Sequence, residues 1–450
     1  MNTSAQSEKH TYMTTAPVEM LVTKMALPSI ISMLISAIYN MADTFFVGRI
    51  STQATGAVGV VYSYMAMIQA VAFFFGHGSA NYISRKLGAK DPGPAARMAA
   101  VGFYSAFIVG SVMGALGLVF IEPFLRLLGS TDTIMPDAKA YFVYILIGTP
   151  FIMTSFVMNN QMRLQGNAMM GMIGISAGAI LNIALDPLLI FGFGMGVGGA
   201  SLATALSQFT AFWILLYLCG RRDGIAIRLK NFRPGLDMYK GIYKGGMPSL
   251  CRQGIGAVSG IVLNQLAQGY GDAAIAAFSV VNRAVGFAYS ALIGYGQGFQ
   301  PVCGFNFGAK LYGRVKKAFW FAVRVGTVYC AVCSVIGFIF APQIIGFFRS
   351  DPDVVEIGSA ALRFQCVLFT VNGYITIASM FLQNIGSTFP ATVLSLARQG
   401  VFLIPSMYVM EALFGLRGME CAQLPADILA IAVSLLFGLK GLSDMEKPKN

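Results

Sequence analysis

The amino-acid sequence predicts an all-α integral membrane protein with twelve transmembrane helices in two pseudo-symmetric bundles of six. Three observations predict this fold: the composition, the recurrence of long apolar segments, and an internal repeat. Of the 450 residues, 56% are hydrophobic and 11% are charged, and the mean hydropathy is +0.68. Soluble domains carry about 25% charged residues. So few charges could not cover a soluble protein of this length, which excludes most soluble enzymes.

Twelve apolar segments are long enough to cross roughly 30 Å of hydrocarbon as α-helices. They comprise residues 25–47, 54–75, 98–120, 137–157, 168–191, 198–219, 246–268, 275–299, 319–341, 359–382, 391–411 and 422–440. We expect each segment to form one membrane-spanning helix.

The positions of the basic residues predict the orientation of the chain in the membrane. With the N-terminus in the cytoplasm, 21 of the 31 Lys and Arg residues fall in cytoplasmic segments and four fall in outer loops. Because basic residues accumulate on the cytoplasmic side, we expect both termini there. The net charge of +12 is then a signal of topology, and we expect no nucleic-acid partner.

The two halves of the sequence repeat each other at an offset of about 220 residues. Matching positions are Pro28 and Pro248, Gly78 and Gly298, Gly88 and Gly308, and Gly166 and Gly386. Each half has six spans, so both halves insert with the same polarity, as in parallel transporter repeats. The predicted domains are an N-lobe (1–219), a basic cytoplasmic linker (220–245) and a C-lobe (246–450).

This architecture favours a transporter, because two lobes that rock around a central cleft give alternating access. A channel is the alternative, but the sequence has neither a filter-like segment nor a ring of charge. The linker, with seven basic and two acidic residues, is either an amphipathic segment on the anionic leaflet or a solvated connection. The sequence lacks a P-loop and any nucleophile–base or metal constellation, so we expect neither an enzyme nor a cofactor.

We expect only two carboxylates well inside the spans, Asp43 in the first and Asp186 in the fifth. A charge within hydrocarbon is costly, which makes each acid a candidate functional group. Both lie about five residues from the outer ends of their spans, so they are expected at similar depth in one pocket of the N-lobe. The equivalent positions in the second half are Leu263 and Ile404, so the repeated fold does not require the acids.

Polar side chains at neighbouring positions are expected to complete this pocket. The candidates are Tyr39, Asn40, Asn182, Ser201 and Thr204. Their oxygens and the two carboxylates suit either reversible protonation or coordination of Na⁺ by Asp43 and Asp186. The structural alternative is that Asp186 marks a kink before Pro187 and that Asp43 caps a break in its helix.

Two arginines are expected inside spans of the second half, Arg283 in the eighth and Arg398 in the eleventh. Their guanidinium groups are expected to contact backbone carbonyls, lipid head groups or an anionic part of a substrate. They argue against assuming a purely cationic substrate.

Five segments of the chain carry a family resemblance. They are Tyr39-Asn-Met-Ala-Asp-Thr-Phe-Phe-Val-Gly48, Ser84-Arg-Lys-Leu-Gly-Ala-Lys-Asp91, Asn160-Gln-Met-Arg-Leu-Gln-Gly-Asn167, Leu181-Asn-Ile-Ala-Leu-Asp-Pro187 and Gln383-Asn-Ile-Gly386. With these segments the sequence resembles the multidrug and toxic compound extrusion (MATE) family, in its DinF-like or MepA-like bacterial branch. The resemblance covers nearly all of residues 20–440.

The resemblance implies a twelve-helix antiporter of the bacterial inner membrane, with two lobes around a V-shaped cleft. Such proteins export amphipathic, often cationic, organic compounds in exchange for H⁺ or Na⁺. The family's ion-coupling site maps onto Tyr39, Asp43, Asn182, Asp186 and Thr204. Some relatives have further acids in the seventh and tenth spans, whereas this sequence has none in 246–268 or 359–382, so coupling in the N-lobe is favoured. We expect a monomer whose partners are small organic substrates and membrane lipids.

Two other transporter classes are alternatives. A major-facilitator carrier predicts an acid before the basic residues of the second loop, and no Asp precedes Arg85 and Lys86 there. A related exporter or flippase of lipid-linked precursors or anionic metabolites would be favoured by a basic cleft that includes Arg283 and Arg398.

Overall fold

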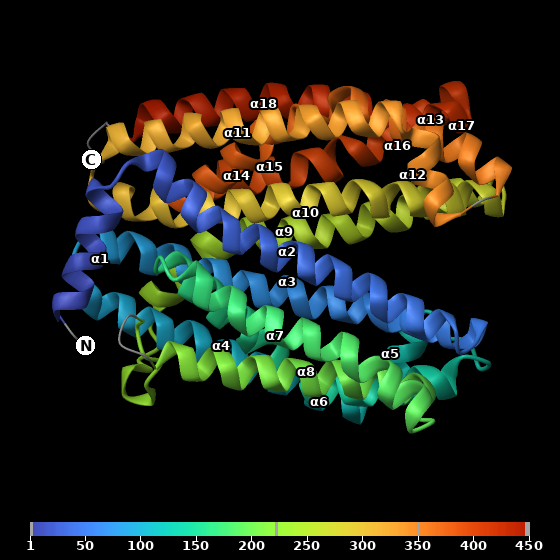
Figure 1. Cartoon of the computed structure of the whole chain (residues 1–450), viewed down its shortest axis with the longest axis horizontal. Coiled ribbons are helices and arrows are strands. Elements are labelled where there is room, and N and C mark those ends of the chain that lie inside the picture. The colour runs from blue at the N-terminus through green and yellow to red at the C-terminus, as the bar shows by residue number, and fades with distance from the viewer. Residues whose placement is uncertain (1–2, 221–223, 350, 446–450) are drawn as a thin grey trace. The chain divides into compact units, whose positions relative to one another are not determined.

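The computed structural model describes residues 3–220, 224–349 and 351–445, and every regular element in these residues is helical (Figure 1). The first half contains α1 (Thr3–Thr15), α2 (Val18–Gly48), α3 (Thr52–Gly88), α4 (Pro92–Val119), α5 (Ile121–Leu127), α6 (Met135–Leu164), α7 (Ala168–Pro187), the π-helix η1 (Leu188–Gly192) and α8 (Gly196–Cys219). The second half contains η2 (Leu229–Asn231), α9 (Leu236–Gln268), α10 (Asp272–Gly308), α11 (Tyr312–Ile339), α12 (Ala341–Phe348), α13 (Pro352–Phe369), α14 (Asn372–Ile385), α15 (Thr388–Leu396), the π-helix η3 (Ala397–Val401), α16 (Leu403–Phe414), α17 (Leu416–Cys421) and α18 (Gln423–Asp444).

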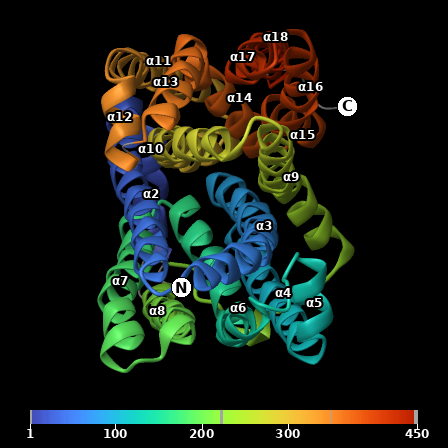
Figure 2. The same cartoon turned by 90° about the vertical axis from the view of Figure 1, so that its right-hand side faces the viewer.

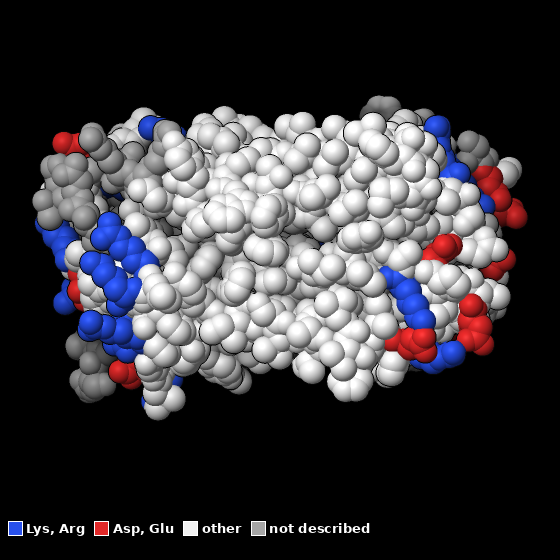
Figure 3. Space-filling view, turned by 90° about the horizontal axis from the view of Figure 1, so that it is seen from below, with Lys and Arg blue, Asp and Glu red and all other residues white. Residues whose placement is uncertain are grey.

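The prediction of a twelve-helix membrane fold is confirmed. Ten stretches of the described chain are long and apolar enough to cross a membrane, and the bent pair α13 and α14 forms an eleventh. The seventh predicted span corresponds to α9, whose first half carries polar and charged residues and lowers its hydropathy. On the face shown in Figure 3, charged side chains gather at the two ends and leave a broad uncharged band between them.

Several spans are less regular than continuous apolar segments suggest. The tenth span consists of α13 and α14, which meet at 58°. The eleventh contains the π-helix η3, and the fifth ends in the π-helix η1 directly after Pro187. Proline has no backbone N–H and disturbs the helical hydrogen-bond ladder, which accounts for the irregular turn after α7.

The described chain divides into two compact units, Met1–Ala16 with Ile31–Gln253 and Pro17–Ile30 with Gly254–Asn450. This division differs from the predicted lobes at 1–219 and 246–450. Residues 17–30 group with the second unit, and the first part of α9, which begins at Leu236, groups with the first. The predicted linker is therefore shorter than expected, and its Arg221, Arg222 and Asp223 lie outside the described residues.

The first unit is a bundle around α6, which packs against α3, α4, α7 and α8 (Figure 2). In the second unit every residue of α14 is buried, and this helix contacts α10, α11 and α18. Residues of α14 correspond through the repeat offset to the largely buried second half of α6. The two repeats thus use equivalent segments as the centres of their bundles.

Helices α3 and α9 approach closely within the first unit because glycines line their contact. A Cβ atom on Gly78 would lie 2.3 Å from the carbonyl oxygen of Ile242, and one on Gly246 would lie 2.1 Å from that of Phe74. Only glycine leaves room for backbones at this separation. The contact fixes the first part of α9 in the first unit.

We predict that Gly78→Ala destabilises the protein, because its new methyl group must displace the backbone of α9. Overpacking of this kind costs about 1–3 kcal/mol, and the midpoint of thermal unfolding should fall. Gly59→Ala, on the same helix, is the matched control because nothing lies within 4 Å of its Cβ position. Equal unfolding midpoints for the two variants would contradict the prediction.

Candidate functional site

The site begins with the packing of α7 against α8. Gly174 and Gly178 of α7 lie directly against α8. A Cβ atom built on Gly174 would lie 2.4 Å from the Leu215 side chain, and one built on Gly178 would lie 2.9 Å from Ala211 Cβ. This close approach lets side chains one and two turns further along α7 face α8. Asn182 and Asp186, four residues apart, therefore lie on one buried face.

Asn182 connects the acid of α7 to the hydroxyl group of α8. Its Nδ2 atom lies 3.4 Å from Asp186 Oδ1 and 3.3 Å from Thr204 Oγ1. All three side chains are buried, and Asp186 has no exposed surface. An Asn side chain has two amide hydrogens, so it can donate to both neighbours at once.

Asp43 comes to the same region from α2. It is partly buried, and its electrostatic neighbours are Asp186, Tyr39 and Tyr141. Tyr141, a fully buried residue of α6, also contacts the Asp43 carboxyl group through its hydroxyl. The two acids of the first half therefore lie near enough to influence each other's charge.

Several acceptor atoms in this region are buried and have no hydrogen-bond partner among the described residues. They are Asp43 Oδ1, Asn182 Oδ1, Asp186 Oδ2 and Gln208 Oε1. Each such atom costs about 1–3 kcal/mol if it stays unsatisfied. A proton on a carboxyl group or a small cation between the oxygens would satisfy them, so the donor set fits either ion.

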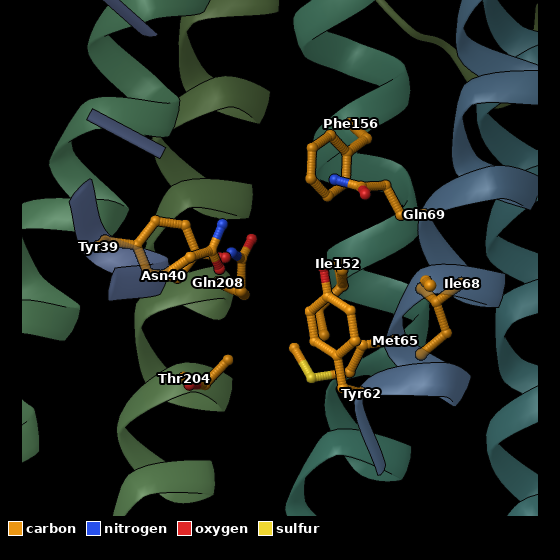
Figure 4. A pocket seen from close by; sticks show the side chains of 11 residues that line it. Tyr39, Asn40, Tyr62, Met65, Ile68, Gln69, Ile152, Phe156, Thr204 and Gln208 are labelled. Carbon is orange, nitrogen blue, oxygen red and sulfur yellow. The ribbon is translucent and has the colours of Figure 1, made fainter. Parts of the chain in front are cut away.

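A pocket opens next to the acids (Figure 4). Its lining residues come from four helices of the first unit: Tyr39 and Asn40 of α2, Tyr62, Met65, Ala66, Ile68 and Gln69 of α3, Ile152 and Phe156 of α6, and Thr204 and Gln208 of α8. In the figure the residues of α2 and α8 face those of α3 and α6 across the space. The lining combines aromatic, aliphatic and amide groups and contains no charged side chain.

The structure brings most of the sequence-predicted candidates together. Tyr39, Asn40 and Thr204 line the pocket. Ser201 does not, because its hydroxyl group donates to the backbone carbonyls of Gly198 and Ala140 at 3.1 and 3.4 Å.

Four polar residues of this region were not predicted from the sequence. Gln208 follows Thr204 by one helical turn, a spacing that could have identified it. Tyr62, Gln69 and Tyr141 come from other helices and gave no such signal.

The second unit holds a buried ion pair that the sequence analysis missed. Arg398 of η3 lies 3.1 Å from Asp427 Oδ1 of α18, and Gln423 Nε2 donates to the same oxygen at 2.8 Å. The expectation that only Asp43 and Asp186 lie well inside spans is therefore wrong. Asp427 is the fifth residue of α18 and lies within the span predicted at 422–440, and contact with η3 helps to bury it.

The two arginines of the second half differ in their surroundings. The Arg398 guanidinium also lies 5.2 Å from the centre of the Tyr289 ring, so a carboxylate and an aromatic face stabilise its charge. Arg283 is exposed on α10. The pairing of Arg398 removes one of the two charges on which a basic cleft would depend.

Comparison with known proteins gives consistent matches over the whole chain. A family model described as MatE matches residues 28–188 and 248–409, two segments that start 220 residues apart. The multidrug export protein MepA of Staphylococcus aureus is 29% identical over 433 residues, which cover 96% of both chains. The protein of the same name from Staphylococcus saprophyticus is 30% identical over 413 residues, which cover 91% of both chains.

A solved structure resembles the whole described fold. A MOP superfamily transporter from Pyrococcus furiosus superposes with a TM-score of 0.91 at 25% identity, covering 97% of this chain and 98% of the other.

We predict that Asp427→Asn lowers the stability of the second unit, because it leaves the Arg398 guanidinium buried without a counter-charge. Breaking one partner of a buried pair costs about 3–5 kcal/mol. The double variant Arg398→Gln with Asp427→Asn should recover most of this loss. Asp132→Asn is the control, since it breaks an exposed pair with Arg126 worth at most about 1 kcal/mol. Thermal unfolding of the wild type and the three variants tests the prediction, and equal losses for Asp427→Asn and Asp132→Asn would contradict it.

Proposed function

Because this chain belongs to the MatE family, we propose that it exports amphipathic organic compounds, including cations, in exchange for H⁺ or Na⁺. Proteins of this family are transporters, so the chain is a multi-pass transporter of the bacterial inner membrane and not an enzyme. The names of its MepA relatives support drug-like substrates. One observation carries the proposed mechanism: the pocket lies beside the acid pair and is lined by Tyr39 and Thr204, which belong to the surroundings of the acids.

The acid pair is proposed as the coupling site, with Tyr39, Asn182 and Thr204 as its polar neighbours. The unsatisfied oxygens of Asp43, Asn182 and Asp186 support this role, because an incoming ion would supply the positive charge or hydrogen that they lack. Two carboxylates in a region of low dielectric hold their charges at high cost, so binding an ion there is favourable.

Coupling to substrate follows from shared residues. Thr204 lines the pocket and accepts a hydrogen bond from Asn182, and Tyr39 lines the pocket and neighbours Asp43. An ion bound by the acids changes the hydrogen bonds of Thr204 and Tyr39, and with them the shape of the pocket. Linkage of this kind between two sites amounts to about 1–3 kcal/mol, which is enough for exchange between ion and substrate.

The pocket lining supports aromatic, amphipathic substrates. Tyr39, Tyr62 and Phe156 offer aromatic faces, and a cation over such a face gains about 0.5–2 kcal/mol. Met65 adapts to ligands of different shapes. The carbonyl oxygens of Gln69 and Gln208 can accept hydrogen bonds from an ammonium group.

Alternating access is proposed to use α2 and α9, the two helices that have residues in both units. Pro28 of α2 lies two residues before the boundary at Ile30, and Pro248 of α9 lies five before the boundary at Gln253. A proline inside a helix removes one backbone hydrogen bond and eases bending. We further propose that both termini are cytoplasmic, as the distribution of Lys and Arg supports, and that the protein acts as a monomer within membrane lipids.

Asp43→Asn and Asp186→Asn are expected to reduce ion-driven export at least about tenfold, the size of a coupling near 1.4 kcal/mol. The assay is efflux from proteoliposomes under a pH gradient or a Na⁺ gradient imposed separately, which also identifies the ion. Asp132→Asn, an exposed acid, is the control. Undiminished ion-driven efflux in both acid variants would exclude the coupling site.

Tyr62→Ala is expected to weaken binding of aromatic cations several-fold while leaving small aliphatic cations little affected, because it removes one aromatic face of the pocket. Equilibrium binding of fluorescent dyes to the purified protein measures the change. Tyr243→Ala is the matched control, since Tyr243 is similarly exposed (53% against 64% for Tyr62) and does not line the pocket. Equal effects of the two substitutions would argue against the proposed substrate pocket.

A further inference from the structure

A second polar cluster lies in the first unit, away from the acid pair, where α3, α6 and α9 meet. We name it the basic cluster; its members are His77 of α3, Asn160 and Arg163 of α6, and Ser249 and Arg252 of α9. The glycine contact between α3 and α9 creates it. That contact brings Ser249 Oγ to 3.0 Å from His77 Nδ1.

Hydrogen bonds link the two arginines through the histidine and the serine. Arg163 donates to His77 Nε2 at 3.3 Å and to Asn160 Oδ1 at 2.5 Å. Arg252 donates to Ser249 Oγ at 3.5 Å. A guanidinium group can only donate, so His77 must accept at Nε2 and donate from Nδ1 to Ser249. The neutral imidazole is the form that fits this chain of bonds.

The Arg163 guanidinium of this cluster is buried, and no acid among the described residues contacts it. Arg163 is 3% exposed, and its Nε atom has no hydrogen-bond partner among the described residues. The charged groups that act on His77 are Arg163 and Arg252, and the one that acts on Arg163 is Arg252. By contrast, the buried Arg398 of the second unit has Asp427 beside it. An unpaired buried ion costs several kcal/mol.

The repeat indicates that helix packing does not need this charge. At the repeat offset, His77 corresponds to Gln297, Arg163 to Gln383, and Arg252 to Ser32. The equivalents of the two arginines and the histidine are thus all neutral, whereas Ser249 matches Ser29. A feature that only one of two equivalent bundles carries is better explained by a ligand than by the fold.

We propose that the basic cluster binds one small anion, with Arg163 Nε–H as the principal donor and Arg252 supplying the second positive charge. A carboxylate, phosphate or halide would satisfy the unpartnered Arg163 Nε–H and balance the charge of that guanidinium group. The anion is either a free inorganic ion, the phosphate of a lipid head group or an anionic group on an exported compound.

The position of the cluster connects it to the pocket. Gln69, Phe73 and His77 lie at successive turns of one face of α3, and Gln69 lines the pocket. Eight residues of helix separate Gln69 from His77, a rise of about 12 Å. Phe73 stacks on His77 and meets the pocket residue Phe156 edge-on. Gln253, next to Arg252, donates to Gln69 at 3.1 Å. A bound anion would therefore stand near the side of the pocket that Gln69 and Phe156 line.

The test measures anion binding without transport, so that its result is independent of the proposed antiport. The full-length protein in nanodiscs of zwitterionic lipid is titrated with sodium phosphate or sodium chloride, and the ionic strength is held constant with the sodium salt of a bulky organic sulfonate. The wild type should show a saturable rise in its unfolding midpoint. Arg163→Gln, which places at 163 the amide found at 383, should lose at least about 90% of that response. Arg283→Gln, at an exposed arginine, should keep it.

Further arms identify the source of the anion and guard against a folding defect. Arg252→Ser, the residue of the equivalent position, should shift the half-saturating concentration upward several-fold even if Arg163→Gln fails to fold. A response to phosphatidylglycerol nanodiscs alone would assign a lipid head group, and protection by an aromatic carboxylate but not by its methyl ester would assign a substrate. The same non-saturating response in the wild type and in both variants, for every probe, would overturn the proposal.

Discussion

The cost of taking charged and hydrogen-bonding groups out of water governs the chemistry of this molecule. Helices satisfy the hydrogen bonds of the backbone internally, so the remaining desolvation free energy comes from buried polar side chains. In the second unit, Asp427 and Arg398 offset this free energy by forming an ion pair. The first unit has no such pair at its buried charges: Asp43, Asp186 and Arg163 each keep one side-chain atom without a hydrogen-bond partner among the described residues. Among the described residues, the carboxylate and guanidinium atoms that are buried without a partner all lie in the first unit, which is why the proposed ion sites are there.

The repeat separates what the fold requires from what function requires. Both halves use a buried central segment, in α6 and α14, and both use glycines where backbones approach, at Gly78 and at Gly298. These packing features are shared because every six-helix bundle must fill its core. The unpaired ionisable groups are not shared. Two bundles with one packing plan can therefore carry different chemistry, since a few polar substitutions at equivalent positions leave the helix contacts intact.

Sequence could predict the features that depend on spacing within one helix. The hydrophobic segments fixed the helices, and the four-residue interval between Asn182 and Asp186 placed both on one face. It could not predict how each helix is rotated against its neighbours. Ser201 was expected in the pocket, yet its helix turns it toward the backbone of α6. Tyr141 and Gln69 were missed because tertiary contacts with other helices, and not their own sequence neighbours, give them their surroundings. Asp427 lies within the predicted span 422–440, so its position in the sequence could have identified it.

The acid pair and the basic cluster of the first unit have opposite sign, and both contact residues that line one pocket. Thr204 and Tyr39 connect its lining to the acids, and Gln69 and Phe156 connect it to the basic cluster. A unit charge about 10 Å from a second one interacts with it by about 1.7 kcal/mol at an effective dielectric of 20. In the proposed substrate pocket, a cationic group would thus be drawn toward the acids and repelled from Arg163 and Arg252. Because the pocket lining is uncharged, no nearby charge would oppose this field, and a compound with one charged end would be expected to bind in one preferred direction.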